Sequence, residues 1–188
     1  MTATSRSKRE IVSFENEPLI LVDSSDQELG VLDKSSCHDG DGRLHRAFSI
    51  FVLNGRGEVL LQKRADGKRL WPGYWSNSCC SHPRRGETTA EAADRRLFEE
   101  LHLRAELQFA YKFEYHARYQ AIGSEHELCW VFVGWCDDAP VFNSEEIEAV
   151  RWLQPDLLDE EMRRTPDAFT PWFQMEWQRL RQEFADLL

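Results

Sequence analysis

The stretch WSNSCCSHP, residues 75–83, places two adjacent cysteines just before a histidine. A thiol can act as a nucleophile, a proton donor or a soft metal ligand, and an imidazole can carry a proton or bind a metal. Three kinds of site therefore fit: half of a structural zinc site, a redox pair, or a catalytic thiol beside a metal ligand. A zinc site would combine Cys79, Cys80 and His82 with Cys37, but the paired CxxC knuckles typical of such sites are absent.

Two further histidines and two glutamates offer metal-ligand atoms elsewhere in the chain. His38 and His45 bracket a Gly- and Asp-rich loop, and Glu125 and Glu127 flank His126 just before an apolar run. On an extended strand both carboxylates share one face, so they can share a metal or couple their titrations. With His82 these residues would make a five-ligand nitrogen and oxygen site. The alternative is a polar strand face and histidines that bind no metal.

A group of charged residues lies on and just before TTAEAADRRLFEELHL, residues 88–103. With two leucines, they match the spacing of the Nudix signature, in which a loop and a helix present carboxylates to magnesium bound to a diphosphate: Glu87, Arg95, Leu97, Glu99, Glu100 and Leu103. Mg²⁺ prefers a few carboxylates plus phosphate oxygens. The alternative is a solvated helix face, with i,i+4 ion pairs from Arg95 to Glu99 and from Arg96 to Glu100.

The match to that signature has three departures. Ser81 stands in place of its first glycine, Arg96 in place of a glutamate, and His102 in place of its second glycine. The missing carboxylate argues against pyrophosphate hydrolysis. It does not argue against binding a magnesium diphosphate.

Basic residues lie on both sides of the cysteine pair: Arg64, Lys68, Arg69, Arg84, Arg85, Arg95 and Arg96. In a chain of formal net charge -10, such clustering could neutralise a diphosphate through charge-assisted hydrogen bonds. Ordinary surface charge is the alternative for each residue taken alone.

Turn signals and apolar periodicity predict the elements that must position these side chains. PLILVDSSDQELGVLDK and RAFSIFVLNGRGEVLLQKR each predict a hairpin. Residues 88–103 predict a helix with a Thr88/Glu91 capping box, a charged face, and an opposite apolar face made of Ala90, Ala93, Leu97 and Leu101. Strands are predicted in LQFAYKFEYHARY, HELCWVFVGWC and EAVRWL, and a terminal helix from near Pro171. This order predicts a mixed α/β sandwich.

Length and composition indicate a single domain over residues 1–188, with the first ten residues disordered. The net charge of -10 argues against binding to nucleic acid or to anionic membranes. No apolar run approaches the roughly 20 residues that span a bilayer, and the N-terminal segment lacks the apolar core of a secretory signal. The five cysteines, an odd number without CxxC spacing, favour reduced thiols. We therefore expect a cytoplasmic protein.

Several segments together resemble type I isopentenyl diphosphate isomerase, the metal-dependent, flavin-free member of the Nudix superfamily. They follow one another in the family's order: LHRAFSIFVLN, QKRADGKRLWPGYWSNSCCSHPRRGE, RRLFEEL, SEHELCWVF and TPDAFTPWF. The resemblance runs from about Leu19 to the terminal helix. It implies a Nudix-type α/β/α sandwich with a mixed sheet.

The resemblance also implies roles for the matching positions. Cys80 and Glu127 match the catalytic pair, and Tyr115 matches a tyrosine that supports it. The ligands of a site filled by Mg²⁺, Mn²⁺ or Zn²⁺ would be His38, His45, His82, Glu125 and Glu127. Glu100 matches the residue that holds a second Mg²⁺, bound to the substrate. The substrate-binding residues would be Lys34, Arg64, Lys68, Arg96 and Trp172.

The implied reaction interconverts isopentenyl and dimethylallyl diphosphate and supplies isoprenoid biosynthesis. One alkene carbon is protonated and another loses a proton, which two acid/base groups on opposite faces can achieve. The indole of Trp172 can stabilise the cationic species and exclude water. In an extended segment Cys80 and His82 share a face, so the thiol can face the pocket while the imidazole binds the metal. Cys79 is expected only to pack beside them.

Two other functions are weighed against this one. A Nudix hydrolase of a nucleoside diphosphate derivative is disfavoured by the missing glutamate at Arg96. An inactive diphosphate-binding module is disfavoured because Cys80, Glu127 and every implied ligand are present. The expected partner is the small-molecule substrate, without nucleic acid or membrane, and the expected assembly is a monomer or a weak homodimer.

Overall fold

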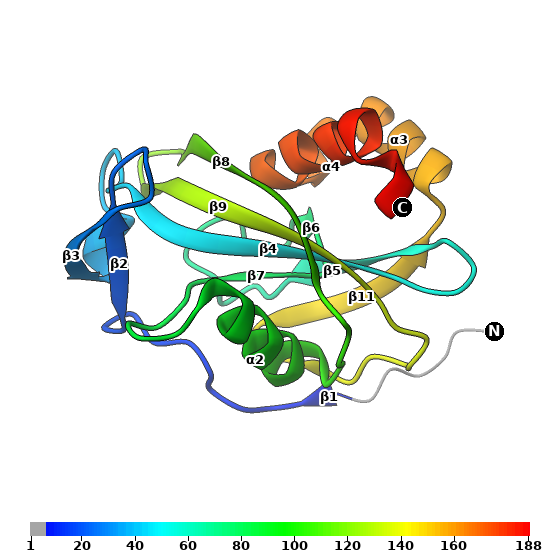
Figure 1. Ribbon diagram of the computed structural model, residues 1–188, viewed down its shortest axis with the longest axis horizontal. Helices are drawn as coiled ribbons and strands as arrows, with labels where there is room; N and C mark the ends of the chain where they lie inside the picture. The colour runs from blue at the N-terminus through cyan, green and yellow to red at the C-terminus, as the bar shows by residue number, and fades with distance from the viewer. Residues whose placement is uncertain (1–6) are drawn as a thin grey trace.

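The central strand β4 (His45–Leu53) organises the sheet in the computed structural model, which describes residues 7–188 (Figure 1). β4 pairs in parallel with β9 (Gly123–Trp135) and, along its other edge, antiparallel with β7 (Cys79–Ser81). β8 (Gln108–Tyr119) runs antiparallel to β9. Almost every residue of β4 is buried, because both faces of the sheet are covered.

Two hairpins complete the nine-stranded sheet. β2 (Pro18–Val22) pairs with β3 (Glu28–Asp33) and meets the start of β4. β5 (Val59–Arg64) follows β4 and pairs with β11 (Ile147–Leu153) and β6 (Trp75–Ser76). Both predicted hairpins are confirmed. A separate pair joins β1 (Ser7–Lys8) to β10 (Phe142–Asn143), so the prediction of disorder is wrong for Ser7 and Lys8. Of the ten residues predicted to be disordered, the first six lie outside the described residues.

Helices cover the two faces of the sheet, which confirms the predicted α/β/α sandwich (Figure 1). α2 (Thr89–Leu101) lies on one face, and α3 (Pro155–Arg164) and α4 (Pro171–Glu183) lie on the other. The short helix α1 (Lys34–Cys37) follows β3. Single 3₁₀ turns, η1 (Pro166–Ala168) and η2 (Ala185–Leu187), flank α4. Within residues 7–188, no helix has the length and apolar character needed to cross a bilayer.

The helix α2 begins as predicted but buries a different face. The capping box of Thr88 and Glu91 is present. Ala92, not Ala90, joins the buried side of the helix, and Ala90 is exposed. Arg96 and Glu100 are also buried, at 3% and 2% exposure, so the prediction that the charges of this helix lie on a separate, solvated face is wrong for these two. Because they pair with each other, the sheet side of α2 can hold them.

The core between the sheet and α4 is rich in aromatic side chains. Phe51 of β4 is fully buried, with ring centroids 5.8 Å from Phe173 and 6.1 Å from Trp177. We expect Phe51→Ala to lower the free energy of unfolding by about 3–5 kcal/mol, because it removes buried area and leaves a cavity. Urea titration with unchanged m-value would measure this loss. Phe14→Ala is the matched control, since Phe14 is 52% exposed and should lose less than about 1 kcal/mol.

Candidate active site and metal centre

The two adjacent cysteines of the short strand β7 have different surroundings. Cys79 is fully buried in the cluster beneath α2, whereas Cys80 lines a cavity. Ser49 of β4 pairs with Cys80 in the strand ladder, which fixes the backbone that carries the thiol. Burial raises the pKa of Cys80 to about 12, although Arg64 opposes this shift. Cys80 is therefore a protonated thiol near neutral pH.

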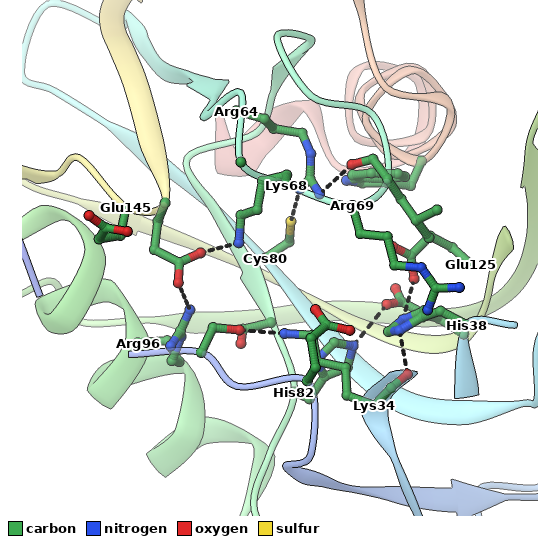
Figure 2. A pocket seen from close by; sticks show the side chains of 18 of the residues that line it. Lys34, His38, Arg64, Lys68, Arg69, Cys80, His82, Arg96, Glu125 and Glu145 are labelled. Atoms are coloured by element: carbon green, nitrogen blue, oxygen red, sulfur yellow. Dashed lines mark hydrogen bonds and ion pairs between the residues drawn. The ribbon is translucent and has the colours of Figure 1, made fainter. Parts of the chain in front are cut away.

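A cavity of about 280 Å³ brings together most of the predicted site residues (Figure 2). Those that line it are Lys34, His38, Arg64, Lys68, Cys80, His82, Arg96, Tyr115, Glu125, Glu127 and Trp172. The other two, His45 and Glu100, lie directly behind the lining. His45 Nε2 is 3.2 Å from His82 Nε2, and Glu100 Oε1 is 2.5 Å from Arg96 Nη2.

Three histidines and a glutamate form a tight cluster at one end of the cavity. Potential ligand atoms of four residues all lie within 4.8 Å of one another: His38, His45, His82 and Glu127. His38 Nδ1 lies 2.8 Å from the Lys34 carbonyl oxygen, and His45 Nδ1 lies 2.7 Å from that of Arg43. Since a carbonyl can only accept, each Nδ1 carries the proton and donates it. Each Nε2 therefore turns a lone pair toward the cluster.

The two glutamates of β9 meet this cluster from the same side of the strand. Glu127 Oε1 lies 3.2 Å from His82 Nε2, and its Oε2 accepts a 2.6 Å hydrogen bond from the Tyr115 hydroxyl. Burial alone would raise the pKa of Glu127, but hydrogen bonds and charge from His45, together with Tyr115, hold it below its usual value. Glu125 stands slightly apart, with Oε2 2.8 Å from His38 Nε2. It lies outside the four-residue group and contacts that group through His38.

The chemistry of this donor set fits a divalent cation. His38 Nε2 and Glu125 Oε2 are buried and form an ion pair at 2.8 Å; the charge of Glu125 and its hydrogen bond outweigh burial and raise the pKa of His38. A bound cation would take the place of the proton between these two atoms. Burial, followed by the charge of His45, lowers the pKa of His82 well below its usual value, so this ring is neutral and can ligate. Imidazole and carboxylate ligands suit Mn²⁺, Zn²⁺ and, less well, Mg²⁺.

The basic residues of the cavity are all engaged by groups of the protein itself. Lys34 Nζ lies 2.9 Å from a Glu17 carboxylate oxygen, and Lys68 pairs with Glu146. Arg64 donates from Nε and Nη2 to the backbone oxygens of Trp71 and Leu70, at 3.1 and 2.9 Å. Its Nη1 lies 3.9 Å from Cys80 Sγ (Figure 2). These residues are therefore held in place at the cavity wall.

Comparison with known proteins assigns the chain to a family. Residues 43–173 match the NUDIX domain. Isopentenyl-diphosphate Delta-isomerase 1 of Photorhabdus laumondii is 42% identical over 174 residues, which cover 92% of this chain and 99% of that protein. The chain belongs to the isopentenyl-diphosphate Delta-isomerase family of Nudix proteins. Isopentenyl-diphosphate Delta-isomerase of Serratia proteamaculans is 44% identical over 158 residues, covering 84% of this chain and 88% of the relative.

A solved structure shares the fold of this chain. The crystal structure of DR0079 from Deinococcus radiodurans superposes with a TM-score of 0.65 and 22% identity. It covers 79% of this chain and 90% of that one. At this identity the likeness concerns the sandwich itself.

Three glutamates on or just before α2 form ion pairs with arginines of this helix. Arg95 binds Glu87 at 2.8 Å and Glu99 at 3.1 Å, and Arg96 binds Glu100. Glu99 and Glu100 both contact Arg96, which lines the cavity, at 3.4 and 2.5 Å. The i,i+4 pairs predicted as the alternative interpretation are thus present, but the Arg96 pair is buried rather than solvated.

An aromatic side chain of this Nudix chain forms part of the cavity wall beside Arg64. Trp172, at the start of α4, is 2% exposed and packs edge-on against Trp71, with ring centroids 5.2 Å apart. The Arg64 guanidinium lies 5.2 Å from the centre of the Trp172 ring. The backbone of Trp71 has a φ of 48°, which a bulky residue rarely adopts. Its carbonyl is one of the two that hold Arg64.

Two buried carboxyl groups beside the Nudix active site were missed from the sequence. Glu146 lines the cavity between Lys68 and Arg96. Glu176, one helical turn after Trp172 in α4, is fully buried and accepts a 3.4 Å hydrogen bond from Cys129. Glu146 lies just before the strand predicted in EAVRWL, and Glu176 lies in the predicted terminal helix. Neither pattern indicated a site residue. Their burial results from tertiary packing, for which a single sequence holds no periodic signal.

Glu176 gives a pH-dependent prediction. Burial raises its pKa from 4.5 to about 8, so the folded protein keeps a proton that the unfolded chain loses. The free energy of unfolding should therefore fall as pH rises through this interval. Glu176→Gln should remove that slope, so its advantage over the wild type should grow between about pH 5 and pH 8, to a few kcal/mol. Thermal unfolding across this range tests it, and a stability difference independent of pH would contradict it.

Proposed function

We propose that this chain interconverts isopentenyl diphosphate and dimethylallyl diphosphate, with Cys80 and Glu127 as the two acid/base groups. Membership of the isomerase family supports the reaction. The observation that carries the assignment of roles is that both side chains line one cavity. The protonated thiol of Cys80 can donate a proton, and the ionised carboxylate of Glu127 can accept one, as such a reaction requires.

The proposed chemistry moves one proton onto the substrate and one proton off it. Protonation of the terminal alkene carbon leaves a tertiary cationic centre, and removal of a proton from the neighbouring methylene forms the new double bond. The reaction is reversible, so the two groups exchange roles with its direction. Tyr115, which donates to Glu127 Oε2, would fix the carboxylate so that Oε1 faces the histidine cluster.

The wall formed by Trp172 would protect the cationic species. Its indole face offers electron density to a cation, and its burial keeps water out of this end of the cavity. Water would otherwise add to the cation and yield an alcohol.

We propose that the histidine cluster, with Glu125 and Glu127, holds a divalent cation, Mn²⁺, Mg²⁺ or Zn²⁺. Such an ion supplies positive charge beside Glu127 and so lowers its proton affinity. The diphosphate would lie against the cations that line the cavity: Lys34, Arg64, Lys68 and Arg96. Its own Mg²⁺ would arrive with the substrate and meet Glu100. The resemblance implies no flavin, and the residues assigned above need none.

An assay with isopentenyl diphosphate and Mg²⁺ tests the proposal. Formation of dimethylallyl diphosphate without released phosphate is the expected result. Release of phosphate without the isomer would instead identify a Nudix hydrolase, and binding without turnover would identify an inactive module. The cytoplasmic location and the monomeric or weakly dimeric state stay predictions.

A further inference from the structure

Glu146 is a buried carboxylate between two cations of the cavity. It comes directly before β11, and its side chain is 4% exposed. One oxygen pairs with Lys68, and the other lies 3.7 Å from Arg96 Nη2. Figure 2 shows a carboxylate joined by dashed lines to both Lys68 and Arg96. The charge of Lys68, followed by that of Arg96, outweighs burial and lowers the pKa of Glu146 to about 2, so it is ionised at any physiological pH.

The backbone around Glu146 holds this carboxylate in place. Its carbonyl accepts from Ala65 N at 3.0 Å, which ties it to the loop that carries Lys68. Its own N–H donates to the Asn143 carbonyl, also at 3.0 Å. These two contacts fix the backbone of Glu146 beside the loop that carries Lys68.

The charges at this end of the cavity are balanced before any ligand arrives. Lys68 has Glu146 as its partner, and Arg96 lies between Glu146 and Glu100. A free diphosphate would bring several negative charges to a place where Lys68 and Arg96 each already have a carboxylate partner. A diphosphate that carries Mg²⁺ brings fewer, and Mg²⁺ favours one or two carboxylates plus phosphate oxygens.

We propose that Glu146 is a specificity-determining residue, which makes this cavity select the magnesium complex of a diphosphate over the free diphosphate. The inference rests on the proposed function, because it takes Lys68 and Arg96 as the diphosphate-binding cations. Glu146 attracts the magnesium complex and repels the free anion. Glu145 also lines the cavity, where it pairs with the exposed Arg9. Glu148, two residues after Glu146, is not among the lining residues; it pairs with Lys63 and its side chain is 43% exposed.

Calorimetric titration of the full chain with inorganic pyrophosphate, with and without Mg²⁺, tests the inference. The measured quantity is the factor by which Mg²⁺ tightens pyrophosphate binding. In Glu146→Gln this factor should fall by about tenfold or more, mainly through tighter binding of free pyrophosphate, because one nearby negative charge is removed. Glu148→Gln, which removes a nearby charge outside the cavity lining, should keep the wild-type factor. Any Mg²⁺ that binds at the histidine cluster affects all three proteins alike, so it does not change the comparison of their magnesium factors.

The outcomes separate this inference from the proposed function. Equal magnesium factors in the wild type and Glu146→Gln, with isomerisation intact, would overturn the role of Glu146 alone. A wild-type protein that bound pyrophosphate in neither buffer would overturn both. An equal loss in Glu148→Gln would show a general charge effect and would also overturn the specific role. If Glu146→Gln does not fold, Glu146→Ala removes the same negative charge and replaces it in the titration.

Discussion

Cys80→Ala is expected to lower kcat for isomerisation by about 10²–10⁴-fold, the usual contribution of a positioned acid/base group. The thiol lines the cavity and is protonated near neutral pH, so its loss removes one of the two proton-transfer groups. The residue is half-buried, and the core clusters beside it are otherwise complete, so the fold should be retained. Steady-state kinetics with purified protein, alongside circular dichroism, measures both effects.

The adjacent cysteine is the matched control. Cys79 points into the core under α2, where it is fully buried, so Cys79→Ala should cost about 1 kcal/mol of stability and leave kcat within a few-fold. The pair differs by one position in one strand, and the two substitutions remove the same atoms. Undiminished turnover in Cys80→Ala, or a comparable loss in Cys79→Ala, would overturn the assignment of the thiol.

Glu127→Gln should have an effect at least as large, because the same carboxylate serves two purposes. It is the second proposed acid/base group, and its Oε1 lies among the imidazoles of the histidine cluster. The amide keeps the volume but cannot take up a proton from the substrate and ligates metal weakly. We expect kcat to fall by about 10³-fold or more, together with a loss of bound divalent metal.

Two measurements separate these contributions. Metal content by elemental analysis reports on ligation alone, and activity in excess Mn²⁺ or Mg²⁺ reports on what remains after metal is restored. Glu114→Gln is the control, since Glu114 lies on the neighbouring strand β8 with a side chain 38% exposed and pairs with His126. Full activity with unchanged metal content in Glu127→Gln would contradict both proposed roles.

Much of the fold was predictable because its local signals agree with its tertiary structure. The Asn54–Gly57 turn, the capping box of α2 and Pro171 at the first turn of α4 each act within a few residues. The helix α3 was missed, although Pro155 stands at its start, because the segment is polar and only Leu158 is buried. The buried face of α2 was misjudged for a related reason. Burial of an arginine and a glutamate depends on partners that a helical pattern does not contain.

The site was predictable where strand periodicity positions side chains, and less so where packing between segments does. Cys80 and His82, like Glu125 and Glu127, alternate along the chain and do line one cavity. Glu146 and Glu176 show no such pattern. Their neighbours, Lys68 and Cys129, are distant in sequence and meet them only after β11 and α4 have packed.

The parallel pairing of β4 with β9 has a consequence for how the protein folds. It sets His45 directly opposite Glu127, residues that are far apart in the chain. The histidine cluster therefore does not exist in any local hairpin and forms only when these two strands join, a contact with a high entropic cost of loop closure. A cation bound there would stabilise contacts made late in folding. The bound cation should leave the folding rate nearly unchanged and slow unfolding. It would therefore lengthen the lifetime of the folded enzyme in addition to its part in the reaction.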